Sequence, residues 1–441
     1  MDEGRGILAL MGSGETSPTM VTLHRELAAH IGGDRDAVIL ETPYGFQVNR
    51  DDISTRAREY FRKSVGLMTE VVPDADTSAG GPADVRADRV RDRVRRASWV
   101  FSGPGSPSYA LGRWRTQRLG EILRERVARG HGVTVMASAA ACTVGFAALP
   151  VYEVYKAGHP PVWLDGLDLL GVLGLPVAVI PHYDNAEGGT HDTRFCYLGE
   201  SRLSRLEREL PEEAAVLGID EHTALIIDLD ASLARVWGRG VMTVRRRGVS
   251  QTVRGGTTLV LDQLRDLVGG RGPSTPLPAQ HRPAAAGHGC AGPAAEDAPA
   301  TLQEAVAASE ARFGEARKAS DAQAMAEVIV ELETVIAAWS ADMEEDQGGE
   351  WARTVLHGMI RLLARQAGRG MAEPEYTLAR ILGPLLDLRR RLRASDAWDL
   401  ADGLRDALAA GGVRLHDTPE GTEWRWEEEG DETRTPTRSQ E

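Results

Sequence analysis

The sequence has few cysteines and no long hydrophobic run. Its three cysteines, Cys142, Cys196 and Cys290, lie far apart and form no CxxC pair, so neither a disulfide framework nor a cysteine-rich zinc site is expected. No apolar run reaches the roughly eighteen residues that a membrane-spanning helix needs. The first residues lack a basic region followed by an apolar one, so no secretory signal is expected. These absences predict a protein of the reducing cytoplasm.

The chain also lacks an excess of basic residues and the lysine motif of nucleotide-binding loops. Its 51 Lys and Arg residues face 65 Asp and Glu residues, which gives a net charge of −14. This balance argues against broad nucleic-acid binding through a cationic surface. The glycine-containing stretch 12–16 lacks the lysine of a G-x-x-x-x-G-K-[ST] loop, so a nucleoside triphosphate site is disfavoured. No cofactor and no metal are predicted.

Short apolar runs alternate with helical stretches from about residue 7 to residue 268. Alternating β and α elements predict an α/β fold, with a mostly parallel sheet flanked by helices on both faces. The stretch 236–244, which contains a Gly-Arg-Gly turn, predicts a hairpin at the edge of this sheet. The expected strands are residues 7–11, 37–41, 99–102, 133–136, 177–181, 216–219 and 224–229.

The composition of the chain changes after this α/β domain, which we assign to residues 1–268. Residues 269–300 are rich in Pro, Gly and Ala and cannot bury a core, so they predict a flexible linker. Residues 301–426 show helical periodicity with few glycines and predict a C-terminal all-α domain. Residues 427–441 are acidic and are expected to be disordered. Helices are expected at 324–339, 351–366, 374–393 and 398–410.

Ser138 is the first candidate for catalysis. It follows the β-branched run Val133–Val135 and opens a stretch of small residues typical of a packed helix. A serine at such a strand-to-helix break projects its hydroxyl from the sheet, and the next backbone N–H is free to bind an anion. Nucleophilic catalysis needs that geometry. The alternative is an ordinary helix N-cap.

An activated serine needs a base, and two histidines compete for this role. His182 directly follows the expected strand 177–181, at the carboxyl end where open α/β sheets place their ligands. The alternative role for His182 is a histidine that caps a loop. His191, nearby in the chain, is a rival base, or a substrate contact together with Arg194.

The base in turn needs an acid that orients it. Glu221 follows the expected strand 216–219, so its carboxylate is placed to hold an imidazole in the right tautomer. The alternative is a turn acid beside Asp220. Glu153 is the second candidate for the orienting acid.

A glycine-containing loop follows the expected strand 99–102. Glycines let the backbone approach a ligand closely and point N–H groups at it. Because the two prolines of this loop have no N–H, the usable donors are those of Gly103, Gly105 and Ser106.

Taken in order, several motifs resemble the serine-peptidase family of dipeptidase E and cyanophycinase, over about residues 5–250. The resemblance implies a fold like that of class I glutamine amidotransferases, with Ser138 as nucleophile, His182 as base and Glu221 as orienting acid. It also implies an oxyanion hole formed by the N–H groups of Ala139 and Gly105. The matching motifs are Gly12-Ser-Gly-Glu15, Gly103-Pro-Gly-Ser106, Met136-Ala-Ser138-Ala-Ala-Ala141, Pro181-His-Tyr183, Gly199-Glu-Ser-Arg202 and Gly218-Ile-Asp-Glu-His-Thr-Ala-Leu225.

The same resemblance bears on the substrate and on the elbow around the serine. Acidic substrates suit the family, which makes Arg194 or Arg202 a candidate to bind a substrate carboxylate. Ser106 and His191 are candidates for further substrate contacts.

The family elbow, the sharp turn that holds the serine, usually has glycine two residues before and after the serine, where this chain has Met136 and Ala140. Glycine relieves crowding at a strained turn, so the methionine favours an inactive elbow.

The C-terminal part is similar to the DALR-type helical domain at the C-terminus of cysteinyl-tRNA synthetases, over about residues 302–426. The motifs are Leu400-Ala-Asp-Gly-Leu-Arg-Asp-Ala-Leu408 and Asp417-Thr-Pro-Glu-Gly-Thr-Glu-Trp424. The synthetase's lysine loop and zinc-ligand cysteines are missing, so the chain is not expected to charge tRNA. The similarity implies recruitment of tRNA or of a cysteine-related partner. The basic run 388–393 is either a phosphate contact or a solvated helix face.

The sequence therefore predicts a cytoplasmic serine hydrolase that cleaves a small peptide or amide and is fused to a helical recruitment domain. The alternative is a catalytically degenerate scaffold whose helical domain binds tRNA or a protein, and Met136 favours it. A glutaminase that supplies ammonia is the least favoured function, because that activity relies on a cysteine where this elbow has serine.

Overall fold

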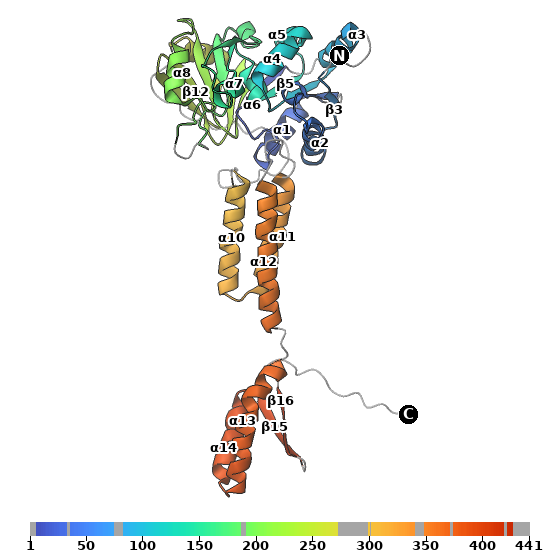
Figure 1. Ribbon diagram of the computed structural model, residues 1–441, viewed down its shortest axis with the longest axis vertical. Helices are drawn as coiled ribbons and strands as arrows, with labels where there is room; N and C mark the ends of the chain where they lie inside the picture. The colour runs from blue at the N-terminus through green and yellow to red at the C-terminus, as the bar shows by residue number, and fades with distance from the viewer. Residues whose placement is uncertain are drawn as a thin grey trace. The chain divides into compact units, whose positions relative to one another are not determined.

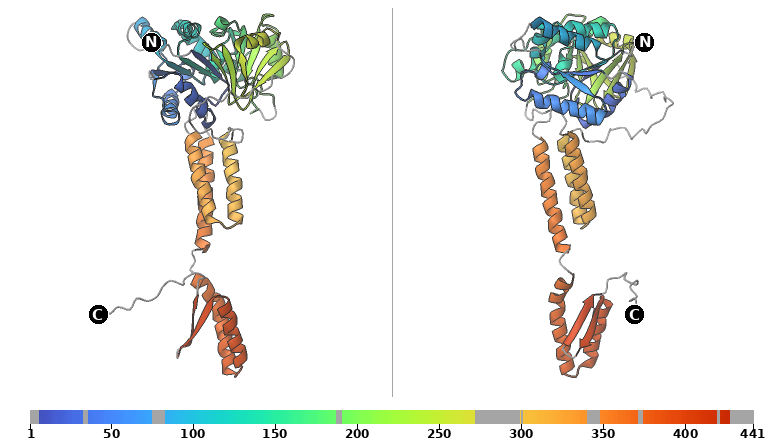
Figure 2. Two further views of the ribbon diagram at one scale, coloured as in Figure 1. Left: turned by 180° about the vertical axis from the view of Figure 1, so that it is seen from behind. Right: turned by 90° about the vertical axis from the view of Figure 1, so that its right-hand side faces the viewer.

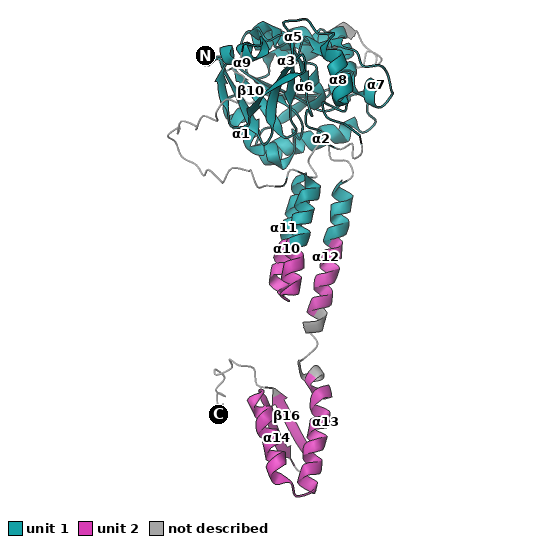
Figure 3. Ribbon diagram, turned by 90° about the vertical axis from the view of Figure 1, so that its left-hand side faces the viewer, with its two compact units in different colours: residues 1–311, 330–356 teal, residues 312–329, 357–441 magenta. Residues whose placement is uncertain are grey.

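The computed structural model describes residues 6–32, 36–74, 83–186, 191–271, 299, 301–339, 348–370, 374–418 and 421–426. The chain divides into two compact units, residues 1–311 with 330–356 and residues 312–329 with 357–441 (Figure 3). Most of the predicted linker and all of the acidic end lie outside the described residues. None of the described helices combines the length and the apolar character that crossing a membrane requires.

The larger sheet of the first unit has eight strands in the order β14-β11-β10-β1-β5-β4-β2-β3. One half, from β1 to β3, is parallel, and the other half pairs antiparallel. The predicted fold class is confirmed, with sheets flanked by helices (Figure 1). The strands are β1 (Ile7–Met11), β2 (Ala37–Leu40), β3 (Thr69–Val72), β4 (Trp99–Ser102), β5 (Val133–Ala137), β10 (Thr223–Asp228), β11 (Leu233–Gly238) and β14 (Thr258–Val260).

A second sheet has six strands in the order β13-β12-β9-β8-β6-β7. It comprises β6 (Ala147–Ala148), β7 (Leu164–Asp165), β8 (Val177–Ile180), β9 (Ala215–Ile219), β12 (Val241–Arg246) and β13 (Val249–Arg254). The predicted hairpin over residues 236–244 is wrong, because β11 belongs to the larger sheet and β12 to the smaller one. Gly238 has a φ of +109°, and a Cβ there would come within 2.3 Å of the His222 carbonyl oxygen. The Gly-Arg-Gly turn therefore carries the chain from one sheet to the other.

The two faces of the larger sheet bury alternate residues, as the period of a strand requires. On β1, Ile7 and Ala9 pack with side chains of α1 and α2, whereas Leu8 and Leu10 pack with those of α4 and α5. Figures 1 and 2 show these two helix pairs on opposite sides of the strands. The helices are α1 (Val21–Ala29), α2 (Arg50–Tyr60), α3 (Ala83–Arg96), α4 (Pro107–Thr116), α5 (Leu119–Ala128), α6 (Ser138–Cys142), α7 (Val151–Tyr155), α8 (Gly199–Glu207) and α9 (Leu261–Val268), with single turns η1 (Pro18–Met20), η2 (Thr42–Tyr44), η3 (Phe61–Val65) and η4 (Gly171–Leu173).

The C-terminal region is helical, and it ends in a β-hairpin that the sequence did not predict. Within the second unit, the predicted basic run lies on α13, and Arg389 of this run is buried. Its guanidinium donates two hydrogen bonds, of 2.7 and 2.9 Å, to the carboxylate of Asp417 on the hairpin. These bonds hold the pKa of Asp417 well below its ordinary range. The elements are α10 (Leu302–Lys318), α11 (Ala322–Trp339), α12 (Gly348–Gly370), α13 (Pro374–Ala394), α14 (Trp398–Ala410), β15 (Val413–Thr418) and β16 (Gly421–Trp426).

Candidate active site

Ser138 lies where β5 ends and α6 begins. Its φ of +45° is in the left-handed region, which side chains other than glycine seldom adopt, so the turn is sharp. Met136, two residues earlier, is fully buried and packs in the core together with Ala140. Its side chain is not part of the wall of the cavity in front of Ser138. The methionine therefore fills the core behind the elbow and leaves the hydroxyl accessible.

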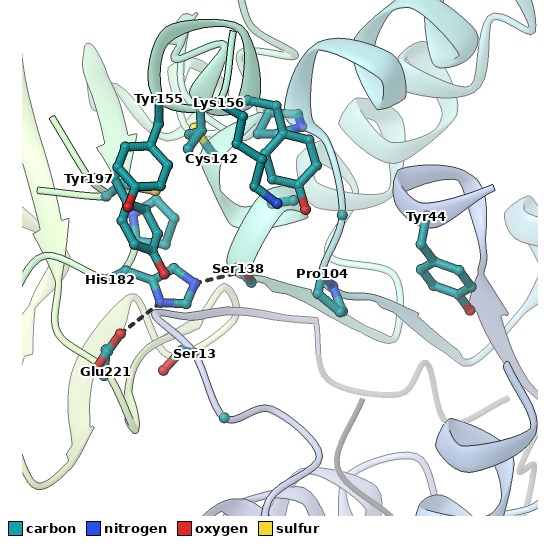
Figure 4. Close-up of a pocket in the computed structure, with 18 of the residues that line it drawn as sticks. Ser13, Tyr44, Pro104, Ser138, Cys142, Tyr155, Lys156, His182, Tyr197 and Glu221 are labelled. Atoms are coloured by element: carbon teal, nitrogen blue, oxygen red, sulfur yellow. Dashed lines mark hydrogen bonds and ion pairs between the residues drawn. The ribbon is translucent and has the colours of Figure 1, made fainter. Parts of the chain in front are cut away.

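His182 follows β8, as predicted, and faces Ser138. Its Nε2 lies 2.9 Å from Ser138 Oγ, and its Nδ1 lies 2.9 Å from Glu221 Oε1 (Figure 4). A carboxylate only accepts hydrogen bonds, so Nδ1 carries the proton on that side and Nε2 accepts the proton of the serine hydroxyl. The backbone of His182 is also left-handed, with a φ of +47°. Its carbonyl accepts the N–H groups of Asn185 and Cys196 at 3.2 and 3.1 Å, which fixes this conformation.

Glu221 lies between β9 and β10 and is held by two residues that the sequence did not single out. The side-chain amide of Asn185 donates to Glu221 Oε1 at 3.1 Å. The backbone N–H of Glu221 donates to Asp184 Oδ1 at 2.7 Å. Both residues follow His182 closely in the chain, so one loop presents the base and also orients the acid. Their position just after a strand end is the signal that could have found them.

The surroundings of Glu221 keep its carboxylate ionised. Burial acts to raise the pKa of Glu221, but the hydrogen bond and the charge of His182 outweigh it and hold the pKa below its ordinary value. Burial, together with the charges of Asp184 and Glu221, raises the pKa of the neighbouring Asp220 to about 7. Asp220 accepts the N–H of Val241 at 2.8 Å. Near neutral pH a negative charge therefore sits on Glu221, where it faces the imidazole.

The predicted oxyanion donors, Gly105 and Ala139, line the same cavity as Ser138. Gly105 has a φ of +132°, and a Cβ there would lie 2.1 Å from the Pro43 carbonyl oxygen, so only glycine fits. Ala139 is the second residue of α6, and first-turn N–H groups of a helix have no acceptor within the helix. The N–H of Ala140 donates to the Gly103 carbonyl at 3.2 Å, which ties the glycine loop to the start of α6.

The structure places five other candidate residues away from the cavity wall. Ser106 caps α4 by accepting the N–H of Tyr109 at 3.2 Å. Glu153 Oε1 accepts a hydrogen bond from Ser108. Arg194 forms an ion pair with Asp192, with hydrogen bonds of 2.8 and 2.9 Å. Arg202 and His191 have exposed side chains.

A cavity of about 560 Å³ opens in front of Ser138. Part of its wall is aromatic, with Tyr152 and Tyr155 from α7 and Tyr197 from the segment before α8. Among the described residues, no group of three or more His, Cys, Asp or Glu side chains is arranged to hold a metal ion. The cavity therefore brings together the Ser138 hydroxyl, which lies within hydrogen-bond reach of an imidazole, the residues Gly105 and Ala139, and an aromatic surface.

Comparisons with known proteins give partial matches. No protein-family model matches the chain. It is 39% identical over 64 residues to a cysteine–tRNA ligase of Thermosipho melanesiensis, which is 14% of each chain. It is 32% identical over 124 residues to a cysteine–tRNA ligase of Edwardsiella ictaluri, which is 21% of this chain and 27% of that protein. The chain thus spans 14% and 27% of the length of the curated relatives it matches.

Solved peptidase structures are among the structural neighbours. A peptidase from an acI-B1 Actinobacterium aligns with a TM-score of 0.43 and 18% identity, over 58% of this chain and 98% of that one. A putative peptidase E protein from Listeria monocytogenes EGD-e aligns with a TM-score of 0.35 and 16% identity, over 57% and 98%. The two resemblances predicted from the sequence motifs therefore reappear in the comparisons.

Proposed function

We propose that the first unit is a serine hydrolase that cleaves a peptide or amide bond of a small substrate. The observation that carries this proposal is the continuous series of hydrogen bonds from Ser138 Oγ through the His182 imidazole to the Glu221 carboxylate, each 2.9 Å long. A nucleophile, a base and an orienting acid within hydrogen-bond reach are what nucleophilic catalysis requires. The scarcity of cysteine favours a reducing cytoplasm as the compartment.

The reaction starts when Ser138 Oγ attacks the carbonyl carbon of the scissile bond and His182 Nε2 takes the hydroxyl proton. Glu221 stabilises the imidazolium that forms and keeps Nδ1 protonated. The N–H groups of Ala139 and Gly105 bind the developing oxyanion. His182 then passes its proton to the leaving amine, and water hydrolyses the acyl-enzyme along the same route.

The test is hydrolysis of a library of short peptides and amides by the full chain, with release of free amine as the readout. Ser138→Ala and His182→Ala are expected to lower the rate at least about 10³-fold. Ser250→Ala is the matched control, because Ser250 is an exposed serine on the edge strand β13, and this variant is expected to keep full activity. Equal rates for wild type and Ser138→Ala would refute the role of Ser138.

A second function, for the C-terminal region, is recruitment of tRNA or of a cysteine-related protein. It is supported by the 39% identity over 64 residues to a cysteine–tRNA ligase. The test is filter binding of tRNA to the full chain at several salt concentrations, because phosphate contacts weaken steeply with salt. Tight, salt-sensitive binding without hydrolysis of any peptide would instead favour a degenerate scaffold that serves only as a binding protein.

A further inference from the structure

The wall of the cavity in front of Ser138 includes two residues from outside the α/β domain. Thr301 directly precedes α10, and Trp339 is the last residue of α11. Both belong to the first compact unit, which takes in the start of α10 and the end of α11 (Figure 3). The motifs that resemble a serine peptidase end near residue 250. This part of the wall is therefore an addition made by the helical region.

Trp339 continues the buried face of its own helix. Leu332, Ile336 and Trp339 follow one another at the spacing i, i+4 and i+7, which puts them on one face of α11, and all three are buried. Trp339 stands at the end of this stripe, where a helix has no further turn to cover a large side chain. It is nevertheless only 6% exposed. Residues outside α11 therefore cover the indole.

One of these residues is His222, which directly follows the orienting acid Glu221. The centres of the Trp339 and His222 rings are 6.5 Å apart at an angle of 78°, an edge-to-face arrangement. His222 also lines the cavity. Its Nδ1 lies 2.9 Å from Thr19 Oγ1, and a Cβ on Gly14 would come within 2.3 Å of the same nitrogen. Trp339 thus packs against a ring that is itself fixed beside the triad.

The first turn of α10 acts on the same imidazole. Thr301 Oγ1 accepts the N–H of Glu304 at 3.1 Å, which fixes the start of α10. Burial lowers the pKa of His222, and the negative charges of Glu221 and Glu304 act in the opposite direction. Two helices of the helical region therefore reach this side of the cavity, α11 through Trp339 and α10 through Thr301 and Glu304.

We propose that Trp339 is a specificity-determining residue of the hydrolase, whose indole closes the cavity beside His222 and limits the size of the substrate group that enters there. This inference rests on the proposed hydrolytic function and deepens it, because it makes the helical region part of the substrate-binding cavity. The indole is apolar and rigid, so the group that fits against it is a small apolar one. Removing the indole is expected to admit a bulkier group.

The experiment compares two fluorophosphonates that differ in one substituent, a methyl group in the first and a naphthylmethyl group in the second. The readout is the ratio of the second-order rates at which the bulky and the small probe inactivate the full chain. Trp339→Ala is expected to raise this ratio by at least about tenfold, since a misfit of one methylene in a pocket already changes selectivity by about that factor. Trp339→Leu, which keeps an apolar side chain at the end of the stripe and so protects the packing of α11, is expected to raise the ratio in the same direction.

Trp351→Ala is the matched control, because Trp351 is a tryptophan of the same unit that is 44% exposed and is not part of the cavity wall. It is expected to keep the wild-type ratio. A ratio that both Trp339→Ala and Trp339→Leu leave unchanged overturns the proposal.

A second measurement does not depend on the reactivity of Ser138. Hydroxyl-radical footprinting with peptide mapping follows the oxidation of His222, whose ring the indole shields. Trp339→Ala is expected to raise this oxidation, and Trp351→Ala to leave it unchanged. No rise in Trp339→Ala overturns the proposal. A rise in a protein whose Ser138 reacts with neither probe would refute the hydrolytic function alone and would still support Trp339 as the wall of the cavity.

Discussion

Replacing Glu221 by glutamine tests how much the negative charge of Glu221 contributes to catalysis, and the neighbouring Asn185 determines how large the loss of rate is. Glu221 Oε1 accepts two hydrogen bonds, from His182 Nδ1 at 2.9 Å and from Asn185 at 3.1 Å. A glutamine can present its amide oxygen to both donors, so the imidazole keeps its tautomer and only the negative charge is lost. Two unit charges about 4 Å apart near a protein surface attract by about 4 kcal/mol. We therefore expect Glu221→Gln to slow the reaction by about 10³-fold.

Removing Asn185 as well frees the glutamine amide to turn. Its NH₂ group then faces Nδ1, which must accept, so Nε2 carries the proton and can no longer take one from Ser138. A triad with the wrong tautomer loses about 10⁴-fold in rate. We expect Asn185→Ala alone to cost less than about tenfold, because the carboxylate of Glu221 accepts from Nδ1 in either orientation.

The assay is the second-order rate of inactivation by a fluorophosphonate, which requires an activated serine but no known substrate. It is measured for wild type, both single variants and the double variant. The reasoning predicts that the double variant is slower than Glu221→Gln by about tenfold. A loss of less than tenfold for Glu221→Gln, or no further loss in the double variant, would refute it.

Three further predictions concern stability. Burial lowers the pKa of His24 to about 4. Between pH 6.5 and pH 4 the unfolded chain therefore binds a proton that the folded chain does not, and the stability falls as the pH falls, by about 3 kcal/mol in total. Urea unfolding at pH 7 and at pH 4.5 is expected to show a smaller difference in stability between the two pH values for His24→Gln than for wild type. Met136→Ala opens a cavity in the core and is expected to cost about 3 kcal/mol, while the fluorophosphonate rate of the folded protein stays within about twofold. Asp417→Asn removes the charge that pairs with the buried Arg389. Because the Asp417 side chain is 41% exposed, solvent screens the pair, and the expected loss of stability of the second unit is about 1 kcal/mol, seen in a thermal melt, with recovery in the double variant Arg389→Met with Asp417→Leu.

In the parallel half, β1, β2, β4 and β5 were predictable because each is a short apolar run, whereas the edge strand β3, which contains Thr69 and the exposed Glu70, was not predicted. Five consecutive residues of β1 and of β5 are buried, and such runs are typical of strands covered on both faces. The division into two sheets was not predictable. The Gly-Arg-Gly turn after β11 has the composition of a hairpin, and only the pairing of β12 with β9 and β13 shows that the chain crosses to another sheet there.

The residues of the candidate site were predictable where a strand end marks them. Ser138, His182 and Glu221 each follow an apolar strand, and the structure brings them within hydrogen-bond reach. Other features of the site had no such mark in the sequence. Arg194 looked available to a substrate, but Asp192, only two residues earlier in the chain, forms an ion pair with it. Lys156, which lines the cavity in front of Ser138, directly follows the short helix α7 with no motif around it, and only the cavity reveals its position.

The most direct test of the central proposal is mass spectrometry of the full chain after reaction with a fluorophosphonate, followed by peptide mapping. The account predicts one added phosphonyl group, on the peptide that contains Ser138, in wild type and in Ser250→Ala. It predicts no adduct in Ser138→Ala. Modification of another serine, or equal labelling of wild type and Ser138→Ala, would contradict it.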